Sequence, residues 1–407
     1  MAPHGRRSRT SAVPLAASLA LTGGVMAGCE SPVPFYRPGK GPPNAPVVGL
    51  GGPAPYFRPG PPATDGAPEG SRDPDAPGPG PAGGPVYAAT GPGMIAPSAR
   101  GMPARLYVAN GRVVDVLDPR TLRVVRRIGA GRAASRVVPS WDLRRLWAAD
   151  AEHGTLVPVG PRSGRLGRPL RVADPARLYF TPDGRDALVL SGRARRVEIR
   201  DPRTMLTRAS VPLPCAAGHA DFTLDGSSLV VSCTAAGRLV RVDVAARRVA
   251  GTIRLPDGAH PEDLRLSPDG TAFFVADAAR GGVWHVDARR FARPGFVRTA
   301  PGARGLAISR DARRLFVLGA GTLSAVAFDA RRVTARWPLP RGGSPVPGGV
   351  SSDGTALWLA DPTGMVYAVS TRSGRVMRQV RVGGRPAGLT VHPQPGRYSL
   401  GGTGLYR

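Results

Sequence analysis

The chain has 407 residues, 42% of them hydrophobic, and a formal net charge of +28 at pH 7. This apolar content can form a core and excludes a fully disordered chain, while 55 Gly and 45 Pro indicate many turns and one unfolded stretch. The charge favours an anionic partner, but Lys40 is the only lysine, and an arginine excess is also produced by the codon bias of a GC-rich genome.

Residues 1–29 have the three parts of an export signal: a basic start, an apolar run over about residues 11–25, and the tetrapeptide Met26-Ala27-Gly28-Cys29. The apolar run is shorter than the roughly 20 residues that a membrane-spanning helix needs. The ending resembles the bacterial lipoprotein signal, which makes Cys29 the expected site of lipidation by acyl chains such as palmitate. The alternative is an ordinary secretory signal with an incidental cysteine. Either way we expect an exported protein, and with acylation one anchored at the outer face of the cell membrane.

Residues 30–103 are dominated by proline and glycine, as in the run Pro77-Gly78-Pro79-Gly80-Pro81. Such a stretch buries too little apolar surface to offset the entropy lost on ordering. We expect a disordered tether that reaches on the order of 50 Å as a flexible coil.

The strongest signal is an internal repeat. Turn residues recur at intervals of 41 to 44, at Asp142, Asp183, Asp225, Asp269, Asp311 and Asp353, and Gly follows four of them. Asp-Gly between alternating apolar runs is a tight-hairpin signal. A second landmark, the end of a valine-rich strand, occurs seven times, at Asp118, Gly160, Asp201, Asp243, Asp287, Asp329 and Ser370. Four short strands per repeat predict an all-β, seven-bladed β-propeller over residues 104–393, followed by a tail at 394–407.

The phase of the repeat at its two ends predicts how the ring closes. The folded part opens with the equivalent of a second strand, Leu106–Ala109, and its last strand, Gly388–Val391, corresponds to a first strand. We therefore expect the C-terminal strand to complete the first blade and so to pair two otherwise free sheet edges.

The repeats resemble the YVTN family of β-propellers, related to the WD-repeat and lactonase-like propellers. The resemblance covers about residues 105–393 and rests on runs such as Leu266-Ser267-Pro268-Asp269-Gly270, Phe274-Val275-Ala276-Asp277 and Val380-Arg381-Val382-Gly383-Gly384-Arg385-Pro386. It implies a fold but no single activity, because the family includes binding proteins, dehydrogenases and hydrolases. Function has to be argued from a site.

Two cysteines remain beside Cys29. Counting outward from the hairpin turn at Asp225-Gly226 places Cys215 and Cys233 at the same end of one blade, about three residues out of register. A disulfide suits an exported protein, and two buried free thiols are the alternative.

One position in each first strand should face the channel entrance: Arg136, Arg177, His219, Asp263, Gly305, Pro347 and Gly388. Glu262 and Arg304 are immediate neighbours of this set. Convergent arginines suit phosphate, sulfate or carboxylate groups, because the guanidinium group donates paired hydrogen bonds. We therefore expect an anionic ligand at the channel mouth, the alternative being arginines that are solvated or paired with nearby aspartates.

The resemblance to lactonases implies a second hypothesis, a metal held by carboxylates around the channel, for which Glu262, Asp263 and His219 are the candidates. These residues lack the fixed spacing of a metal site, so we expect no metal and no cofactor. His153 and His260 lie in loops predicted on the same face.

Arginines also recur on the predicted outer strands, for example Arg126, Arg247 and Arg378, where charge protects exposed edges. Aromatic residues make up only 6%, and no groove-reading motif is present, so we do not expect a nucleic-acid partner. No Gly-x-Ser-x-Gly, phosphate-loop or His-Glu-x-x-His motif occurs. The expected function is a monomeric, non-enzymatic binding or scaffold module for a protein or an anionic envelope component. The alternative is a lactonase-like or other hydrolase.

Overall fold

The computed structural model describes residues 99, 101–181, 184–292, 294–340 and 344–393. The predicted signal with Cys29, all of the predicted tether except residues 99 and 101–103, and the tail at 394–407 lie outside the described residues, as does the turn residue Asp183. Among the described residues, no helix combines the length and the apolar character needed to cross a membrane.

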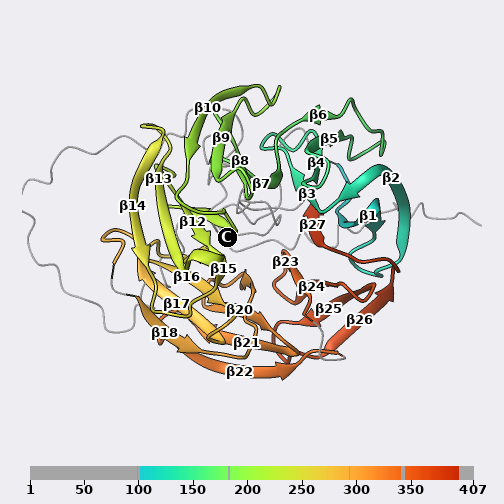
Figure 1. Cartoon of the computed structure of the whole chain (residues 1–407). Coiled ribbons are helices and arrows are strands. Elements are labelled where there is room, and N and C mark those ends of the chain that lie inside the picture. Colours follow the sequence, from blue (N-terminus) through green and yellow to red (C-terminus); the bar gives the residue numbers. More distant parts are fainter. Residues whose placement is uncertain (1–98, 100, 182–183, 293, 341–343, 394–407) are drawn as a thin grey trace, which may run out of the picture. The chain divides into compact units, whose positions relative to one another are not determined.

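The described residues form seven antiparallel sheets that follow one another around a ring, the predicted seven-bladed β-propeller (Figure 1). Blade 1 consists of β27 (Gly388–His392), β1 (Arg105–Leu117) and β2 (Val124–Ala134). Blades 2 and 3 consist of β3 (Arg136–Pro139), β4 (Leu146–Asp150), β5 (Thr155–Val159) and β6 (Leu170–Arg171), then β7 (Pro175–Phe180), β8 (Ala187–Ser191), β9 (Arg196–Arg200) and β10 (Thr207–Pro212).

The remaining four blades have the same order of strands. Blades 4 and 5 consist of β11 (Ala220–Phe222), β12 (Ser228–Cys233), β13 (Arg238–Asp243) and β14 (Arg248–Arg254), with the short 3₁₀ helix η2 (Thr234–Ala236), then β15 (Pro261–Leu266), β16 (Ala272–Asp277), β17 (Gly282–Asp287) and β18 (Gly295–Arg298). Blades 6 and 7 consist of β19 (Gly305–Ile308), β20 (Arg314–Gly319), β21 (Thr322–Ala327) and β22 (Arg332–Pro338), then β23 (Val346–Val350), β24 (Ala356–Asp361), β25 (Met365–Ser370) and β26 (Val376–Arg381).

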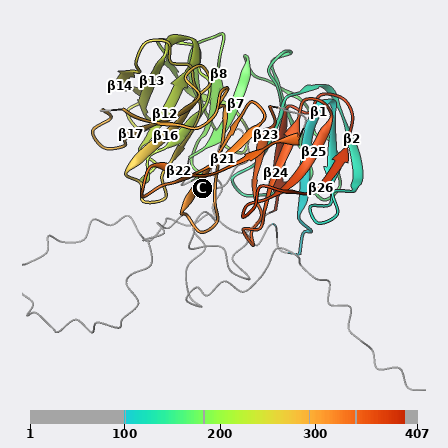
Figure 2. The same ribbon diagram turned by 90° about the horizontal axis from the view of Figure 1, so that it is seen from below.

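The burial of a strand depends on its place in the blade. Second strands such as β16 and β24 are buried at every residue, because neighbouring blades cover both faces of the sheet. Outer strands such as β14 and β22 alternate between exposed and half-buried residues, the period-2 pattern of a strand at the ring's perimeter. Seen from the side, the strands run between the two faces of the ring (Figure 2).

The predicted Asp-Gly turns join first and second strands. In blade 4 the Gly226 amide donates to the Thr223 carbonyl at 2.9 Å, and Gly226 has a φ of +71° that glycine adopts without strain. The Asp225 carboxylate accepts the amide of Ser227 at 3.1 Å. Ala312 has a φ of +61° at the equivalent turn of blade 6, so this turn forms there without a glycine.

The hydrophobic core lies between blades rather than inside any one of them. In one cluster Leu106 and Val108 of blade 1 pack with Trp358 of blade 7 and with Leu389 of the closing strand. Because each cluster joins two neighbouring sheets, no blade can bury its apolar faces alone.

The structure confirms the predicted ring closure. β27 pairs antiparallel with β1, from Arg105 opposite His392 to Ala109 opposite Gly388. The second half of β1, from Gly111 to Leu117, pairs with β2 instead. β1 therefore serves as one long strand where the sequence predicts two, with the change of partner at Gly111, whose φ is +63°.

Removal of residues 388–407 should lower the midpoint of thermal unfolding sharply. The truncated chain loses the backbone partners of β1 and the packing of Leu389 and Val391, whose burial contributes about 3–6 kcal/mol. Circular dichroism melts against a chain that lacks only residues 394–407 provide the comparison. Equal melting midpoints for the two truncations would contradict closure by β27.

Candidate functional site

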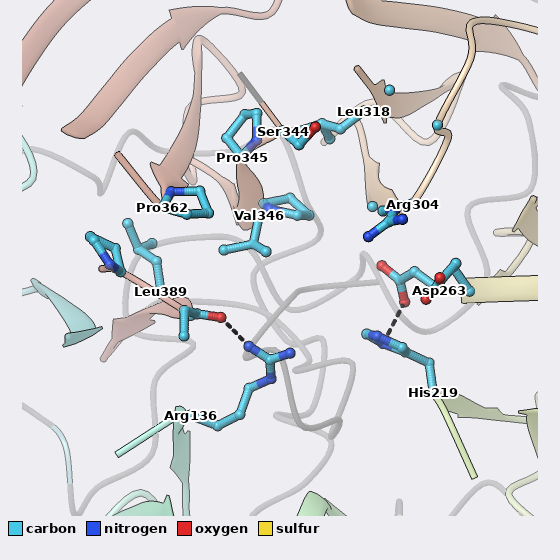
Figure 3. Close-up of a pocket in the computed structure, with 18 of the residues that line it drawn as sticks. Arg136, His219, Asp263, Arg304, Leu318, Ser344, Pro345, Val346, Pro362 and Leu389 are labelled. Carbon is cyan, nitrogen blue, oxygen red and sulfur yellow. Dashed lines mark hydrogen bonds and ion pairs between the residues drawn. The ribbon is translucent and has the colours of Figure 1, made fainter. Parts of the chain in front are cut away.

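A cavity of about 590 Å³ lies where the first strands of the blades begin. All six residues expected at the channel mouth line it: Arg136, Arg177, His219, Glu262, Asp263 and Arg304. The other three members of the sevenfold set, Gly305, Pro347 and Gly388, line it as well. One equivalent position from every blade therefore faces the same space, as the phase of the repeat predicts. Figure 3 labels three of these residues, Arg136, His219 and Asp263, around the cavity.

Three neighbouring blades are linked by a chain of polar contacts at this mouth. An Arg177 guanidinium nitrogen donates to His219 Nε2 at 2.6 Å. His219 Nδ1 lies 3.3 Å from Asp263 Oδ1, the contact drawn in Figure 3. Because arginine can only donate, Nε2 must accept, and the ring proton is placed on Nδ1, facing the carboxylate.

His219 is held neutral by this environment. Burial, together with the Arg177 guanidinium, lowers the pKa of His219 to about 4. The tautomer imposed by Arg177 agrees with a neutral ring, since a protonated imidazole has no acceptor nitrogen. His219 thus bridges a cation and an anion without adding charge to the cavity.

Asp263 is the fixed anion of the site. Its side chain is 2% exposed, with Oδ1 at 3.0 Å from Arg265 and Oδ2 accepting the Leu306 amide of the next blade at 3.0 Å. Burial alone would favour the neutral acid, but Arg265 and His219 outweigh it and hold the pKa of Asp263 below its ordinary value. The Asp263 carboxylate therefore links blade 5 to His219 of blade 4 and to Leu306 of blade 6.

Arg136 and Arg177 are two cations held close to each other in a partly desolvated position. Burial, together with the charge of Arg177, lowers the pKa of Arg136 to about 9, so the group remains charged at neutral pH. The pKa of Arg177 is likewise lowered, mainly by burial. Arg136 donates to the carbonyl of Ala387, and the buried Nε atoms of both arginines lack a hydrogen-bond partner in the described residues.

Glu262 and Arg304 complete the predicted set at a more open part of the cavity. Burial raises the pKa of Glu262, against the opposing pull of Arg304. The Arg304 side chain is exposed, while its backbone is held because its amide donates to the Leu318 carbonyl at 2.9 Å. Within the described part of the chain, Arg304 forms no ion pair.

Sequence reasoning missed a fourth arginine and an apolar side of the cavity. Arg385 lines the cavity from the loop before β27, three residues ahead of the strand, whereas Arg304 immediately precedes β19. The repeat therefore gave no signal for Arg385. The other missed residues include Ser344, Pro345, Pro362 and Pro386, from loops with no periodic pattern, and Leu318, Val346 and Leu389, from strands.

The residues proposed for a metal do not form a donor set. Both ring nitrogens of His219 already face Arg177 and Asp263, and Asp263 is engaged by Arg265 and Leu306. Across the described residues, no group of three or more His, Cys, Asp or Glu side chains is arranged to hold a metal ion. His153 and His260 are not among the residues that line the cavity, and His153 Nδ1 lies 2.8 Å from Asp150.

A disulfide joins Cys215 and Cys233, whose Cα atoms are 5.9 Å apart. Both cysteines are buried, in the cluster between blades 3 and 4. The 18-residue separation encloses the segment that carries His219, so the crosslink restricts the backbone from which this side chain reaches the cavity.

Comparison with known proteins supports the architecture. A family model for YNCE-like β-propellers matches residues 81–395, whereas no curated protein matches the sequence. The fold is similar to hydrazine synthase from Kuenenia stuttgartiensis, at 17% identity and a TM-score of 0.54 over 66% of this chain and 89% of that one.

Two further solved structures are similar. Dihydro-heme d1 dehydrogenase NirN in complex with DHE has 13% identity and a TM-score of 0.55, over 70% of this chain and 74% of that one. Apo AztD from Citrobacter koseri has 13% identity and a TM-score of 0.52, over 72% of this chain and 98% of that one. At such identities the similarity concerns the fold alone.

The depressed pKa of His219 predicts a loss of stability in mild acid. The His219 imidazole takes up a proton near pH 6.5 in the unfolded chain and only near pH 4 in the folded chain. The free energy of unfolding is therefore fully retained above pH 6.5 and decreases as the pH falls from 6.5 to 4. In His219→Gln the amide can still accept from Arg177 and donate to Asp263, but it does not titrate. Between pH 7 and pH 5 the free energy of unfolding of this variant should fall by about 1–2 kcal/mol less than that of the unmodified chain.

Urea titrations at several pH values measure this difference. His392, buried with its pKa lowered to about 3, contributes a similar slope that remains in both proteins. Measurements at pH 8, where both imidazoles are neutral, show the direct cost of the substitution. An unchanged dependence on pH in the variant would contradict a neutral His219.

Proposed function

We propose that this chain, which belongs to the YNCE-like β-propeller family, is a lipid-anchored extracytoplasmic binding module that takes an anionic group of an envelope component into the channel-mouth cavity. The observation that carries the proposal is the convergence of Arg136, Arg177, Arg304 and Arg385 on one cavity. The family match supports the propeller, and the anchor and the ligand are our proposal.

The charge balance of the cavity supports an anionic ligand. Two carboxylates face the four arginines, and one of them, Asp263, is already compensated by Arg265. His219 adds no charge at neutral pH. The remaining positive charge lies partly out of water, where ionic interactions are stronger than at an open surface. An incoming anion would also give hydrogen-bond acceptors to guanidinium groups that donate in pairs.

The alternative, a hydrolase, lacks support from the arrangement of these groups. A general base needs a free acceptor within reach of its substrate, and His219 already accepts from Arg177 and faces Asp263 through Nδ1. Glu262 is the one carboxylate in the cavity not committed to an inter-blade contact. A hydrolase that used His219 or Asp263 as its base would first have to break the Arg177–His219–Asp263 contacts, whereas binding of an anion leaves them in place.

The anchor part of the proposal rests on the sequence ending at Cys29. Replacing Cys29 with Ser should move the protein from the membrane fraction to the soluble exported fraction, because acylation needs the thiol. Fractionation with immunoblotting measures the distribution. Continued membrane retention of the serine variant would contradict a lipid anchor.

The anionic partner is tested with the Cys29→Ser chain, so that acyl chains do not mediate retention. Its co-sedimentation with isolated cell envelopes should weaken steeply between low and physiological salt. Adding Arg304→Gln and Arg385→Gln, two exposed cavity residues, should weaken binding about 10-fold or more, as expected for the loss of charge-assisted hydrogen bonds.

A matched control separates the cavity from general basicity. Arg332→Gln and Arg378→Gln remove the same charge from the exposed outer strands β22 and β26. This pair should leave binding nearly unchanged. Equal weakening by both pairs, or binding insensitive to salt, would contradict an anion site at the channel mouth.

A further inference from the structure

The cavity has two chemically different walls. Its polar wall is built by Arg136, Arg177, His219, Asp263 and Arg304, from blades 2 to 5 and the start of blade 6. Its apolar wall is built by Leu318, Pro345, Val346, Pro347, Pro362 and Leu389, from blades 6, 7 and 1. Figure 3 shows Pro345, Val346, Pro362 and Leu389 on the side away from His219 and Asp263.

The apolar wall is held in place by its packing. Pro345 and Pro347 are buried, and a Cβ atom on Gly305 would come within 2.7 Å of the Pro347 ring. Leu389 belongs to the core cluster that closes the ring, where it packs against Gly348 so closely that no Cβ would fit there. An ordered wall of this kind binds an apolar surface without a large loss of side-chain entropy.

Proline also removes hydrogen-bond donors from this wall. Pro345, Pro347, Pro362 and Pro386 have no amide hydrogen, so four backbone positions around this side of the cavity cannot donate to a polar ligand. Apart from the exposed side chains of Ser344 and Arg385, this side of the cavity therefore offers few partners to a hydrated anion. It suits a hydrocarbon surface instead.

Arg136 stands at the junction of the two walls. One of its guanidinium nitrogens donates to the carbonyl of Ala387, which follows Pro386 in the loop that leads into β27. This bond fixes the direction of the guanidinium group at the point where the two kinds of surface meet. An anionic head bound there would leave the rest of its molecule against the prolines.

The size of the cavity exceeds that of an anionic head alone. At about 590 Å³ it lies in the range of sites for whole organic ligands, which are mostly apolar with a few polar groups that set orientation. A bare phosphate or carboxylate would leave the apolar wall covered by water. Each methylene that replaces such water strengthens binding by about 3- to 4-fold.

We propose that the channel-mouth cavity selects an amphipathic monocarboxylate, with its carboxylate at Arg136 and its hydrocarbon body against the wall formed by Pro345, Val346 and Leu389. This inference rests on the proposed function and specifies its ligand class. A planar carboxylate matches the guanidinium group in shape.

The test is calorimetric titration of the full chain with acetate, butyrate, hexanoate and octanoate, with hexanol and inorganic phosphate as reference probes. Affinity should rise about 3- to 4-fold per methylene until the apolar wall is covered. Hexanol should bind at least 10-fold more weakly than hexanoate, because it lacks the charge that Arg136 recognises.

Two substitutions assign the effect to the two walls. Val346→Thr keeps the branched shape of this half-buried residue but makes it polar, and should reduce the gain in affinity per methylene between acetate and octanoate. Val125→Thr, on the half-exposed outer strand β2, is the matched control and should change nothing. Arg136→Gln should weaken every carboxylate, and the exposed Arg385→Gln serves the same purpose if the buried substitution impairs folding.

The outcomes separate this inference from the proposed function. Equal affinity for acetate, octanoate and phosphate would overturn the amphipathic ligand and leave an anion site standing. Hexanol binding as tightly as hexanoate would overturn the role of Arg136. Failure of all these anions to bind, together with salt-insensitive retention on cell envelopes, would overturn the proposed function itself.

Discussion

The structure depends on a constraint that acts on every blade: both faces of its sheet are apolar, so it must lie between two others. Clusters of buried side chains join neighbouring sheets all around the ring, and a linear stack would leave two end faces in water. The pairing of β27 with β1 removes those ends by joining strands from opposite termini of the propeller. Backbone hydrogen bonds and the packing of Leu389 thereby close the ring and, at the same place, form part of the cavity.

Closure also converts a sequence repeat into a site. Seven equivalent positions at the starts of the first strands face one cavity. Differences in residue type between the repeats therefore become differences in chemistry around the wall of this cavity. Blades 2 to 5 supply arginine, histidine and aspartate at that position, whereas blades 6, 7 and 1 supply Gly305, Pro347 and Gly388. The cavity is consequently polar on one side and apolar on the other. This asymmetry allows a nearly symmetric fold to orient a ligand.

The polar side is stabilised by contacts that leave some of its charge unpaired. His219 is neutral and joins Arg177 to Asp263, and Asp263 in turn holds the Leu306 amide of the next blade. These residues therefore connect three blades and line the cavity at once. Positive charge remains on Arg136 and its neighbours, which is why we interpret the site as one for binding an anion rather than for catalysis.

The sequence by itself determined the number of blades, the closing strand and the six residues expected at the channel mouth. Those predictions rest on strand periodicity and on a repeat interval of 41 to 44 residues. Both patterns can be recognised in the sequence without knowing which residues are in contact in the folded chain. Only the tertiary structure decided the Arg177–His219 bond, the merging of two predicted strands into β1, and the apolar wall with Arg385. These features depend on side-chain directions across blades and on aperiodic loops, whose positions are set by packing between residues far apart in the chain.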